Sequence, residues 1–360
     1  MEMGEVMKNI MYRKKSLLVF LTGALIVGSL TACAGKKDKK ADDGKEKSKV
    51  KVEEGTLEED SVVITVGSET VTYAQMLVYA YILRDMYNSS YGSSLWSYQL
   101  DEETTLEDYA REELVSMVTQ IKVIGQQAKK QDVILSNDER TEIKGRAEEF
   151  FEKVSEKNRE KYCMTLEVVE KTFQENALAT KMFYLATEEV DTDISDEEAK
   201  QTRIQYLQIL TNGTDRNGTE ISMDAKTKKE AAKRIKKLRA EAKTADSFYS
   251  FASENTDSRE VEVTIGSNSE GYEQAFLDAA VSLEDGELSR VIEGENAYYI
   301  IYCVSSYDED ATMEKKEQII AESENEMFQE KYAQWLSKYE VVISNSYWEQ
   351  VAVNPKDGEQ

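Results

Sequence analysis

The chain has 360 residues, with 45 Lys and Arg against 70 Asp and Glu, so its formal net charge is −25, and it contains no histidine and a single proline. Without histidine there can be no Ser-His-Asp or Cys-His catalysis, no histidine-ligated metal and no side chain that ordinarily titrates near neutral pH. The acidic balance disfavours nucleic acid as a partner, because Lys and Arg supply most of the affinity for phosphates. The length predicts two or three domains.

The first residues have the features of a secretory leader. Arg13, Lys14 and Lys15 precede an uncharged, mostly apolar run over residues 17–30, which is too short to span a bilayer comfortably. The run ends in Leu30-Thr31-Ala32-Cys33, which resembles the bacterial lipobox. This resemblance implies that residues 1–32 are a lipoprotein signal peptide and that Cys33 is lipidated on the extracytoplasmic face of the cell membrane. The alternative is a cysteine that happens to end a hydrophobic anchor.

Residues 33–60 are predicted to be a lipidated cysteine followed by a disordered tether. The segment is rich in Lys, Asp and Glu and has almost no large apolar side chain. It therefore cannot bury enough surface to offset the entropy lost on ordering.

Residues 61–195 are predicted to form an N-terminal helical domain that starts with one strand. The β-branched run 62–66 indicates this strand, and Thr72 is a suitable N-cap for a helix beginning at Tyr73. Apolar residues at helical spacing predict further helices over 105–131, 136–157 and 165–189. The Met and aromatic residues of this region could line a promiscuous binding cleft, although ordinary core stripes explain them as well.

A compact α+β domain is predicted over residues 203–305. An acidic stretch with Ser195 as a helix N-cap marks the boundary before it. The pattern then predicts a strand over 203–210, a basic amphipathic helix, a short helix around Phe248, a strand over 261–265, a helix over 272–280 and a strand over 298–304. The order is therefore βααβαβ.

This region resembles the parvulin-type peptidyl-prolyl isomerases. The resemblance is most specific in its second half, where Phe276 begins a small-residue helix, Gly286-Glu287-Leu288-Ser289 follows, and the last strand reads Ala297-Tyr298-Tyr299-Ile300-Ile301. It is weaker in the first strand, Tyr206-Leu207-Gln208-Ile209-Leu210. Together with the lipobox and the helical segments, it makes the whole chain similar to the PrsA/SurA class of extracytoplasmic foldases.

The resemblance also implies a set of site residues. Gln208 and Tyr299 stand where the family has its two signature histidines, and with Asp257 they match its polar catalytic site. Phe276 matches the aromatic floor of the proline pocket, Tyr272 its apolar wall and Asn296 a polar group at its rim. The alternative for Phe276 is a plain core residue. Because both histidines are replaced, we expect isomerase activity to be weak or lost.

After this domain, residues 312–345 are predicted to form a long helix and a strand at 339–343 that pack on the N-terminal domain, followed by a tail at 346–360. Neither this strand nor the one at 62–66 is stable unpaired, so we expect the two to pair. The predicted fold class is thus α+β, a discontinuous, mostly helical chaperone domain with an inserted parvulin-like domain. Cys163 and Cys303 then lie in different domains and are expected to be free and buried rather than bridged.

The predicted function is that of a membrane-anchored extracytoplasmic foldase or chaperone for secreted proteins. Its expected partners are unfolded secreted polypeptides and, through the lipid anchor, the membrane; monomer and dimer both remain open. The alternative is a non-catalytic accessory lipoprotein that binds one envelope partner through a parvulin-like scaffold. No cofactor and no metal are expected, because the residue types present provide no metal-ligand cluster or nucleophile-base pair.

Overall fold

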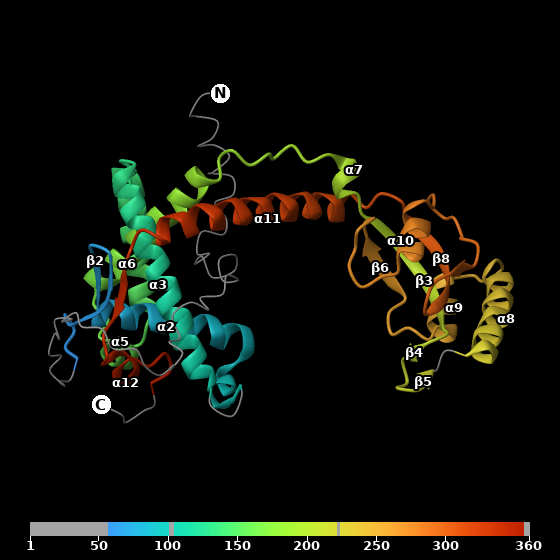
Figure 1. The fold of residues 1–360 in the computed structure, drawn as a ribbon, viewed down its shortest axis with the longest axis horizontal. Coiled ribbons are helices and arrows are strands. Elements are labelled where there is room, and N and C mark those ends of the chain that lie inside the picture. Colours follow the sequence, from blue (N-terminus) through green and yellow to red (C-terminus); the bar gives the residue numbers. More distant parts are fainter. Residues whose placement is uncertain (1–56, 101–103, 222–223, 356–360) are drawn as a thin grey trace, which may run out of the picture. The chain divides into compact units, whose positions relative to one another are not determined.

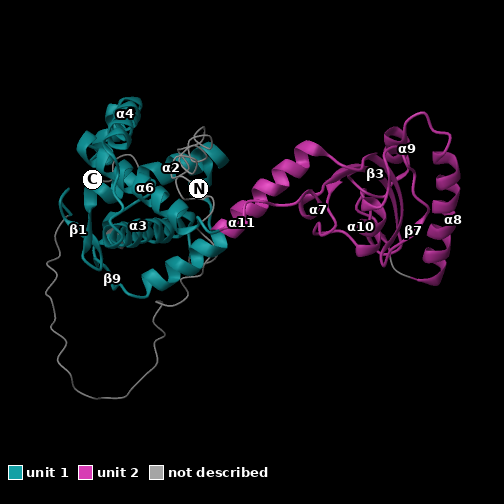
Figure 2. Ribbon diagram, turned by 90° about the horizontal axis from the view of Figure 1, so that it is seen from above, with its two compact units in different colours: residues 1–189, 325–360 teal, residues 190–324 magenta. Residues whose placement is uncertain are grey.

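The structure is a computed structural model that describes residues 57–100, 104–221 and 224–355, so the predicted signal peptide, Cys33 and most of the tether lie outside the described residues. The chain divides into two compact units (Figures 1 and 2). Unit 1 combines the N-terminal part up to Glu189 with the C-terminal part from Asn325, and unit 2 runs from Val190 to Glu324. Each is described on its own below.

Unit 1 contains a small antiparallel sheet that joins the two ends of the chain. Its strands are β1 (Val62–Val66), β2 (Glu69–Thr72) and β9 (Val341–Ile343), in the order β2-β1-β9. Ile64 is the Cα partner of Ile343, which confirms the predicted pairing of the two strands. Gly67 turns β1 into β2 with a φ of +56°, a conformation that glycine adopts without strain.

Helices make up the rest of unit 1. They are α2 (Tyr73–Tyr91), the 3-10 helix η2 (Ser93–Ser97), α3 (Leu106–Lys130), α4 (Asn137–Lys153), α5 (Glu156–Lys161), α6 (Leu166–Ala186) and α12 (Tyr347–Gln350). A long helix, α11 (Glu309–Leu336), starts in unit 2 and ends in unit 1. Hydroxyl caps begin most of these helices, and Thr72 accepts a hydrogen bond from the Gln75 backbone as predicted.

The predicted helix over 136–157 is interrupted in the structure. α4 ends at Lys153, and the side chain of Ser155 caps a new short helix by accepting from the Asn158 backbone N–H at 3.3 Å. The apolar stripe of α4 ends at Val154, and residues 155–161 contain no apolar side chain. Ser155, a helix-capping residue inside the predicted helix, indicated the break.

The C-terminal segment completes the core of unit 1. The ring of Phe328 on α11 is fully buried and lies 5.0 Å from that of Phe183 on α6. Beyond β9, Tyr347 and Val353 are also fully buried, and the Tyr162 hydroxyl donates to the Val353 carbonyl at 3.0 Å. Residues 346–353, which the sequence leaves as a tail, are therefore part of this core.

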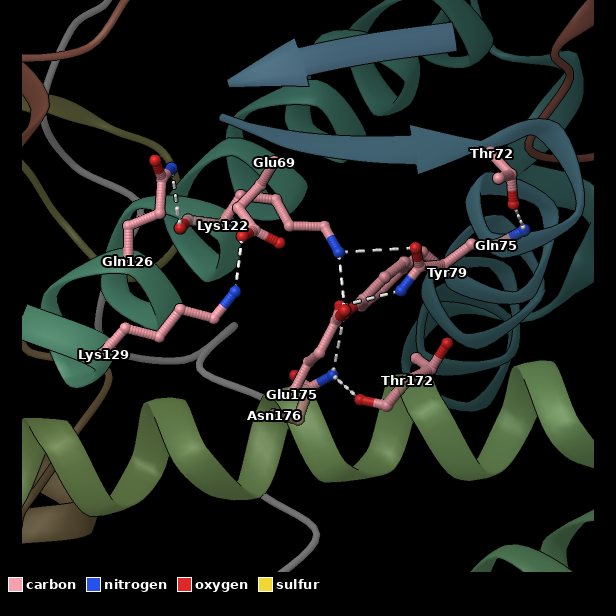
Figure 3. Close-up of polar contacts among 10 residues, drawn as sticks. All are labelled: Glu69, Thr72, Gln75, Tyr79, Lys122, Gln126, Lys129, Thr172, Glu175 and Asn176. Carbon is pink, nitrogen blue, oxygen red and sulfur yellow. Dashed lines mark hydrogen bonds and ion pairs between the residues drawn. The ribbon is translucent and has the colours of Figure 1, made fainter. Parts of the chain in front are cut away.

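A buried polar network crosses three helices of unit 1 (Figure 3). Lys122 on α3, whose side chain is 3% exposed, donates to Glu175 on α6 at 2.6 Å. Gln75 on α2 donates to the second oxygen of the same carboxylate at 2.7 Å. Burial lowers the pKa of Lys122, and the charge of Glu175 opposes that shift.

Unit 2 is built on a four-stranded antiparallel sheet. Its strands are β3 (Thr202–Leu210), β6 (Glu262–Ile265), β7 (Ile292–Glu293) and β8 (Ala297–Ser305), in the order β6-β3-β8-β7. The remaining elements are α7 (Asp196–Ala199), β4 (Gly213–Thr214), β5 (Glu220–Ile221), α8 (Ala225–Ala242), α9 (Phe248–Asn255) and α10 (Gln274–Val281). The predicted α+β class is confirmed.

Side chains from the two faces of this sheet form two separate apolar clusters. Leu207 and Ile300 pack with α8 and α9. Tyr206 and Tyr299 pack with α10 on the opposite face, because side chains alternate along a strand. The residues that resemble the isomerase signature are therefore placed by the β3-β8 pair and α10.

The two described cysteines are free. Cys303 is buried in unit 2 and Cys163 is half-buried in unit 1. No helix within the described ranges is long and apolar enough to cross a membrane.

Candidate functional site

The two residues that the resemblance places at the family's histidine positions face each other across neighbouring strands. Gln208 on β3 and Tyr299 on β8 are Cα partners in the antiparallel register. Side chains at such a pair lie on the same face of a sheet, within contact distance. Gln208 and Tyr299, which are far apart in the sequence, therefore lie next to each other on one face of the sheet of unit 2.

Phe276 lies at the centre of an aromatic cluster. Its ring centroid is 5.0 Å from that of Tyr299, 5.2 Å from that of Tyr206 and 5.4 Å from that of Tyr272. Phe276 is only 1% exposed, in an apolar cluster that also contains aliphatic side chains such as Leu277 and Ile301. The side chain that the resemblance places at the floor of a proline pocket is therefore buried.

Glu273, which precedes α10, fills the space beside this cluster. Its carboxylate accepts hydrogen bonds from the Asn296 backbone N–H at 2.9 Å, from the Glu295 backbone N–H and from the Tyr299 hydroxyl at 3.2 Å. Burial and the negative charge of Glu273 raise the pKa of Tyr299 well above its ordinary value. Tyr299 is consequently a neutral phenol at physiological pH, and its hydroxyl donates a hydrogen bond to the Glu273 carboxylate.

The turn at Gly294 leaves room for this carboxylate. A Cβ atom at residue 294 would clash with the Glu273 carboxylate and would lie 2.9 Å from the Tyr299 ring. Only glycine allows the chain to pass this closely. The sequence gives no local signal for the role of Glu273, because its contacts depend on a turn about twenty residues further along the chain.

Asp257 has partners of its own. One oxygen accepts from the Leu210 backbone N–H at 2.9 Å and the other pairs with Arg234 on α8 at 3.0 Å. These bonds tie the end of β3 to α8, a helix that packs on the face opposite Phe276. Both oxygens of the Asp257 carboxylate thus take part in contacts that connect β3 with α8.

The remaining polar groups lie at the ends of β3 and β8. The Asn296 side chain accepts from Asn212 at 3.0 Å, and the Asn296 carbonyl accepts from the Thr211 backbone N–H at 2.7 Å. Tyr206, which sequence reasoning did not assign to the site, is hydrogen-bonded to Ser258 at 2.9 Å. Tyr206 lies on β3 two residues before Gln208. Because alternate residues of a strand share a face, this spacing could have assigned Tyr206 to the site.

The chemistry open to this cluster is restricted. It offers the aromatic faces and hydroxyls of three tyrosines, the half-buried amide of Gln208, and the carboxylate of Glu273, which accepts from the Tyr299 hydroxyl at 3.2 Å. Within the described ranges, no group of three or more Cys, Asp or Glu residues could hold a metal ion.

Residues 209–305 match the PPIC-type PPIase domain of the rotamase family. The curated foldase protein PrsA of Clostridium acetobutylicum is 24% identical over 300 residues, which cover 77% of this chain and 86% of that protein. The predicted resemblance to foldases with a parvulin-type domain is therefore confirmed, and this chain carries such a domain.

Two solved structures are also similar. The crystal structure of foldase protein PrsA from Streptococcus pneumoniae has a TM-score of 0.32 and 19% identity, covering 67% of this chain and 88% of that one. The peptidylprolyl isomerase PrsA from Bacillus cereus has a TM-score of 0.31 and 18% identity, covering 78% of this chain and 91% of that one.

Proposed function

We propose that this protein, whose residues 209–305 match the PPIC-type isomerase family, is an extracytoplasmic foldase that holds unfolded secreted polypeptides and has weak or no isomerase activity. The observation that carries the proposal is the covered state of Phe276, 1% exposed among three tyrosines, beside the replaced histidine positions. The name of the curated relative, a foldase, supports the chaperone part.

The chemistry of prolyl isomerisation explains why a covered Phe276 matters. The barrier to rotation is about 18–20 kcal/mol and arises from the double-bond character of the C–N bond. An apolar pocket lowers it by disfavouring the planar, polar amide, which requires the proline ring to enter. Here the rings of Tyr206, Tyr272 and Tyr299 occupy the positions around Phe276.

A protease-coupled assay on a proline-containing peptide tests the catalytic part. We expect the rate with this protein to stay close to the uncatalysed rate, with an active parvulin as the positive control. A rate near that of the active parvulin, reduced by Phe276→Ala and by Tyr272→Ala, would contradict the proposal. Circular dichroism of each variant checks that unit 2 remains folded.

Suppression of aggregation tests the chaperone part. We expect the protein to slow the aggregation of several unrelated unfolded proteins. Stoichiometric capture of one envelope protein, without suppression of the others, would instead favour the accessory lipoprotein that binds a single partner.

The membrane anchor is proposed from the sequence around Cys33. We expect Cys33→Ser to abolish incorporation of a labelled fatty acid and to move the protein from the membrane fraction to the soluble fraction, because two acyl chains provide the hydrophobic attachment. Cys163→Ser is the matched control and should leave both properties unchanged. Retention of the label in Cys33→Ser would disprove lipidation at this residue.

A further inference from the structure

An open, aromatic pocket lies in unit 1, on residues that the parvulin domain does not include. It has a volume of about 560 Å³ and is lined by Ser94, three leucines and four tyrosines, Tyr87, Tyr91, Tyr98 and Tyr109. The lining comes from the end of α2, from η2, from residues just after it and from the start of α3. Its volume falls in the range of roughly 300–1,000 Å³ that is usual for binding sites.

Several side chains that line the pocket are exposed. Tyr91 is 73% exposed, Tyr98 is 66% exposed, and Leu100 and Tyr109 are each 46% exposed. Single exposed apolar side chains are ordinary on a protein surface, but a contiguous group of them indicates an interaction site. Tyrosine suits such a site because it offers a large rigid face at a low entropic cost.

Hydrogen bonds fix the framework of the pocket. Trp96 on η2 donates to Asn88 on α2 at 2.8 Å, and its ring lies 5.6 Å from that of Tyr87. The Leu106 backbone N–H donates to the Tyr98 carbonyl at 3.2 Å. The tyrosines are therefore presented on a pre-formed surface, which reduces the entropy lost on binding.

The start of α3, which supplies Leu106 and Tyr109 to the pocket, is acidic, although its Glu107 accepts from the Val353 and Asn354 backbone N–H groups. The first two turns of α3 carry four carboxylates, Glu107, Asp108, Glu112 and Glu113, against one guanidinium, Arg111, which pairs with Asp108 at 3.8 Å. Glu113 is half-buried and accepts a hydrogen bond from the Tyr87 hydroxyl at 2.6 Å. In the part of the chain that the structure describes, Glu113 has no Lys or Arg partner.

We propose that this tyrosine pocket binds an extended segment of an unfolded polypeptide in which Arg or Lys side chains alternate with apolar ones. The apolar side chains would pack on the leucines and tyrosine rings, and the cation would lie over a tyrosine face close to Glu113. Cation–π contacts and a nearby carboxylate both favour a cation over a neutral side chain. The proposal rests on the foldase function and names the class of client segment that this part of the protein prefers.

The test compares three fluorescein-labelled, unstructured peptides binding to the full-length protein. The first contains Leu, Arg, Phe and Ser in a repeating order, and in the other two every Arg is replaced by citrulline or by Glu. Fluorescence anisotropy should give a Kd for the Arg peptide that is at least about tenfold lower than for the citrulline peptide. The Glu peptide should have the highest Kd. At high salt, the difference in Kd between the Arg and citrulline peptides should become smaller.

Variants connect this preference to the pocket. Tyr98→Ser combined with Tyr109→Ser should weaken binding of the Arg peptide by about tenfold or more, because aromatic anchors dominate such contacts. Glu113→Gln should reduce the preference for Arg over citrulline. The matched control is Tyr249→Ser, which removes a 49% exposed tyrosine from α9 of unit 2 and should leave the Kd unchanged.

Equal affinity for the three peptides, or unchanged binding by the pocket variants, would overturn the proposal. The aggregation assay separates it from the general function. If the wild-type protein suppresses aggregation and the pocket variants suppress it equally well, the foldase function stands and the pocket is not the client site. If the wild-type protein suppresses no aggregation, the proposed chaperone function is wrong. The Kd values of the three peptides then decide on their own whether the pocket binds Arg-containing segments.

Discussion

At the scale of single residues, the buried pair Lys122 and Glu175 carries a high cost if it is broken. We expect Glu175→Gln to lower the free energy of unfolding of unit 1 by about 3 kcal/mol, because it leaves the cation of Lys122 buried beside a neutral amide. Replacing both residues by apolar ones, Lys122→Met with Glu175→Leu, should cost less, since no buried charge is then left uncompensated, although the buried amide of Gln75 loses its partners. Urea denaturation of the three proteins measures the differences.

The exposed pair of Lys153 and Glu149 on α4 provides the control for this prediction. Their side chains are 73% and 66% exposed although they lie only 2.6 Å apart. Glu149→Gln should leave the unfolding curve unchanged, because water screens a surface pair. A similar loss of stability in Glu149→Gln and Glu175→Gln would show that burial is not the deciding factor.

Some residues of the candidate site could be predicted from the sequence, and others could not. Gln208, Phe276 and Tyr299 could be found from the sequence because each occupies a fixed place in a short motif. Glu273 could not, because its position beside Tyr299 depends on the turn at Gly294, which no short motif connects to it. The burial of Phe276 also follows from three rings that come from separate elements.

At the scale of elements, residues 339–355 complete unit 1 although they lie far from β1 and α2 in the sequence. We expect a chain that ends at Lys338 to lose cooperative unfolding of unit 1, because it lacks β9 and the buried Tyr347, Val351 and Val353. Each buried side chain of this size contributes about 1.5–3 kcal/mol, and the total stability of a domain is only about 5–15 kcal/mol. Calorimetry should retain the transition of unit 2.

A chain that ends at Pro355 is the matched control for this truncation and should keep both transitions. If the chain ending at Lys338 also kept both transitions, the C-terminal segment would be dispensable for unit 1. Hydrogen exchange offers a second measurement, since the Ser344 backbone N–H donates to the Val63 carbonyl at 2.8 Å and should be protected in the intact protein.

The elements themselves were the most predictable feature. Hydroxyl caps and apolar periodicity placed the helix starts at Tyr73 and near residues 106, 137 and 166 to within a residue or two. The return of residues 346–353 to the core was not predicted, because a four-residue helix and a few scattered valines produce no periodic signal. The β4-β5 pair was not predicted either, because strands of two residues are too short to show an alternating pattern.

At the scale of the whole molecule, the lack of histidine and the number of buried tyrosines determine how stability depends on pH. Burial raises the pKa of Tyr79, Tyr162 and Tyr347 above the ordinary value of 10.0. Above that value the unfolded chain releases tyrosine protons that the folded chain retains. The stability from these groups is thus fully present below pH 10 and is lost as the pH rises further.

We therefore expect the free energy of unfolding to be nearly constant between about pH 6 and about pH 8, where no side chain ordinarily titrates. Above pH 10 it should fall, with each buried tyrosine contributing up to about 1.4 kcal/mol per pH unit. Urea titrations at several pH values measure this, and tyrosinate absorbance should rise together with unfolding. A marked change in stability near pH 6.5 would contradict the expectation.

The pairing of Ile64 with Ile343 has a consequence for the order in which the protein assembles. A ribosome makes a chain from its N-terminus, so β1 exists long before its partner β9 is made. Unit 2 is continuous from Val190 to Glu324, and all of its strands are available earlier. Since domains generally fold as units during synthesis, unit 2 should mature first. The N-terminal part of unit 1 then stays incomplete, with its apolar side chains unprotected, until β9 and the residues after it are made.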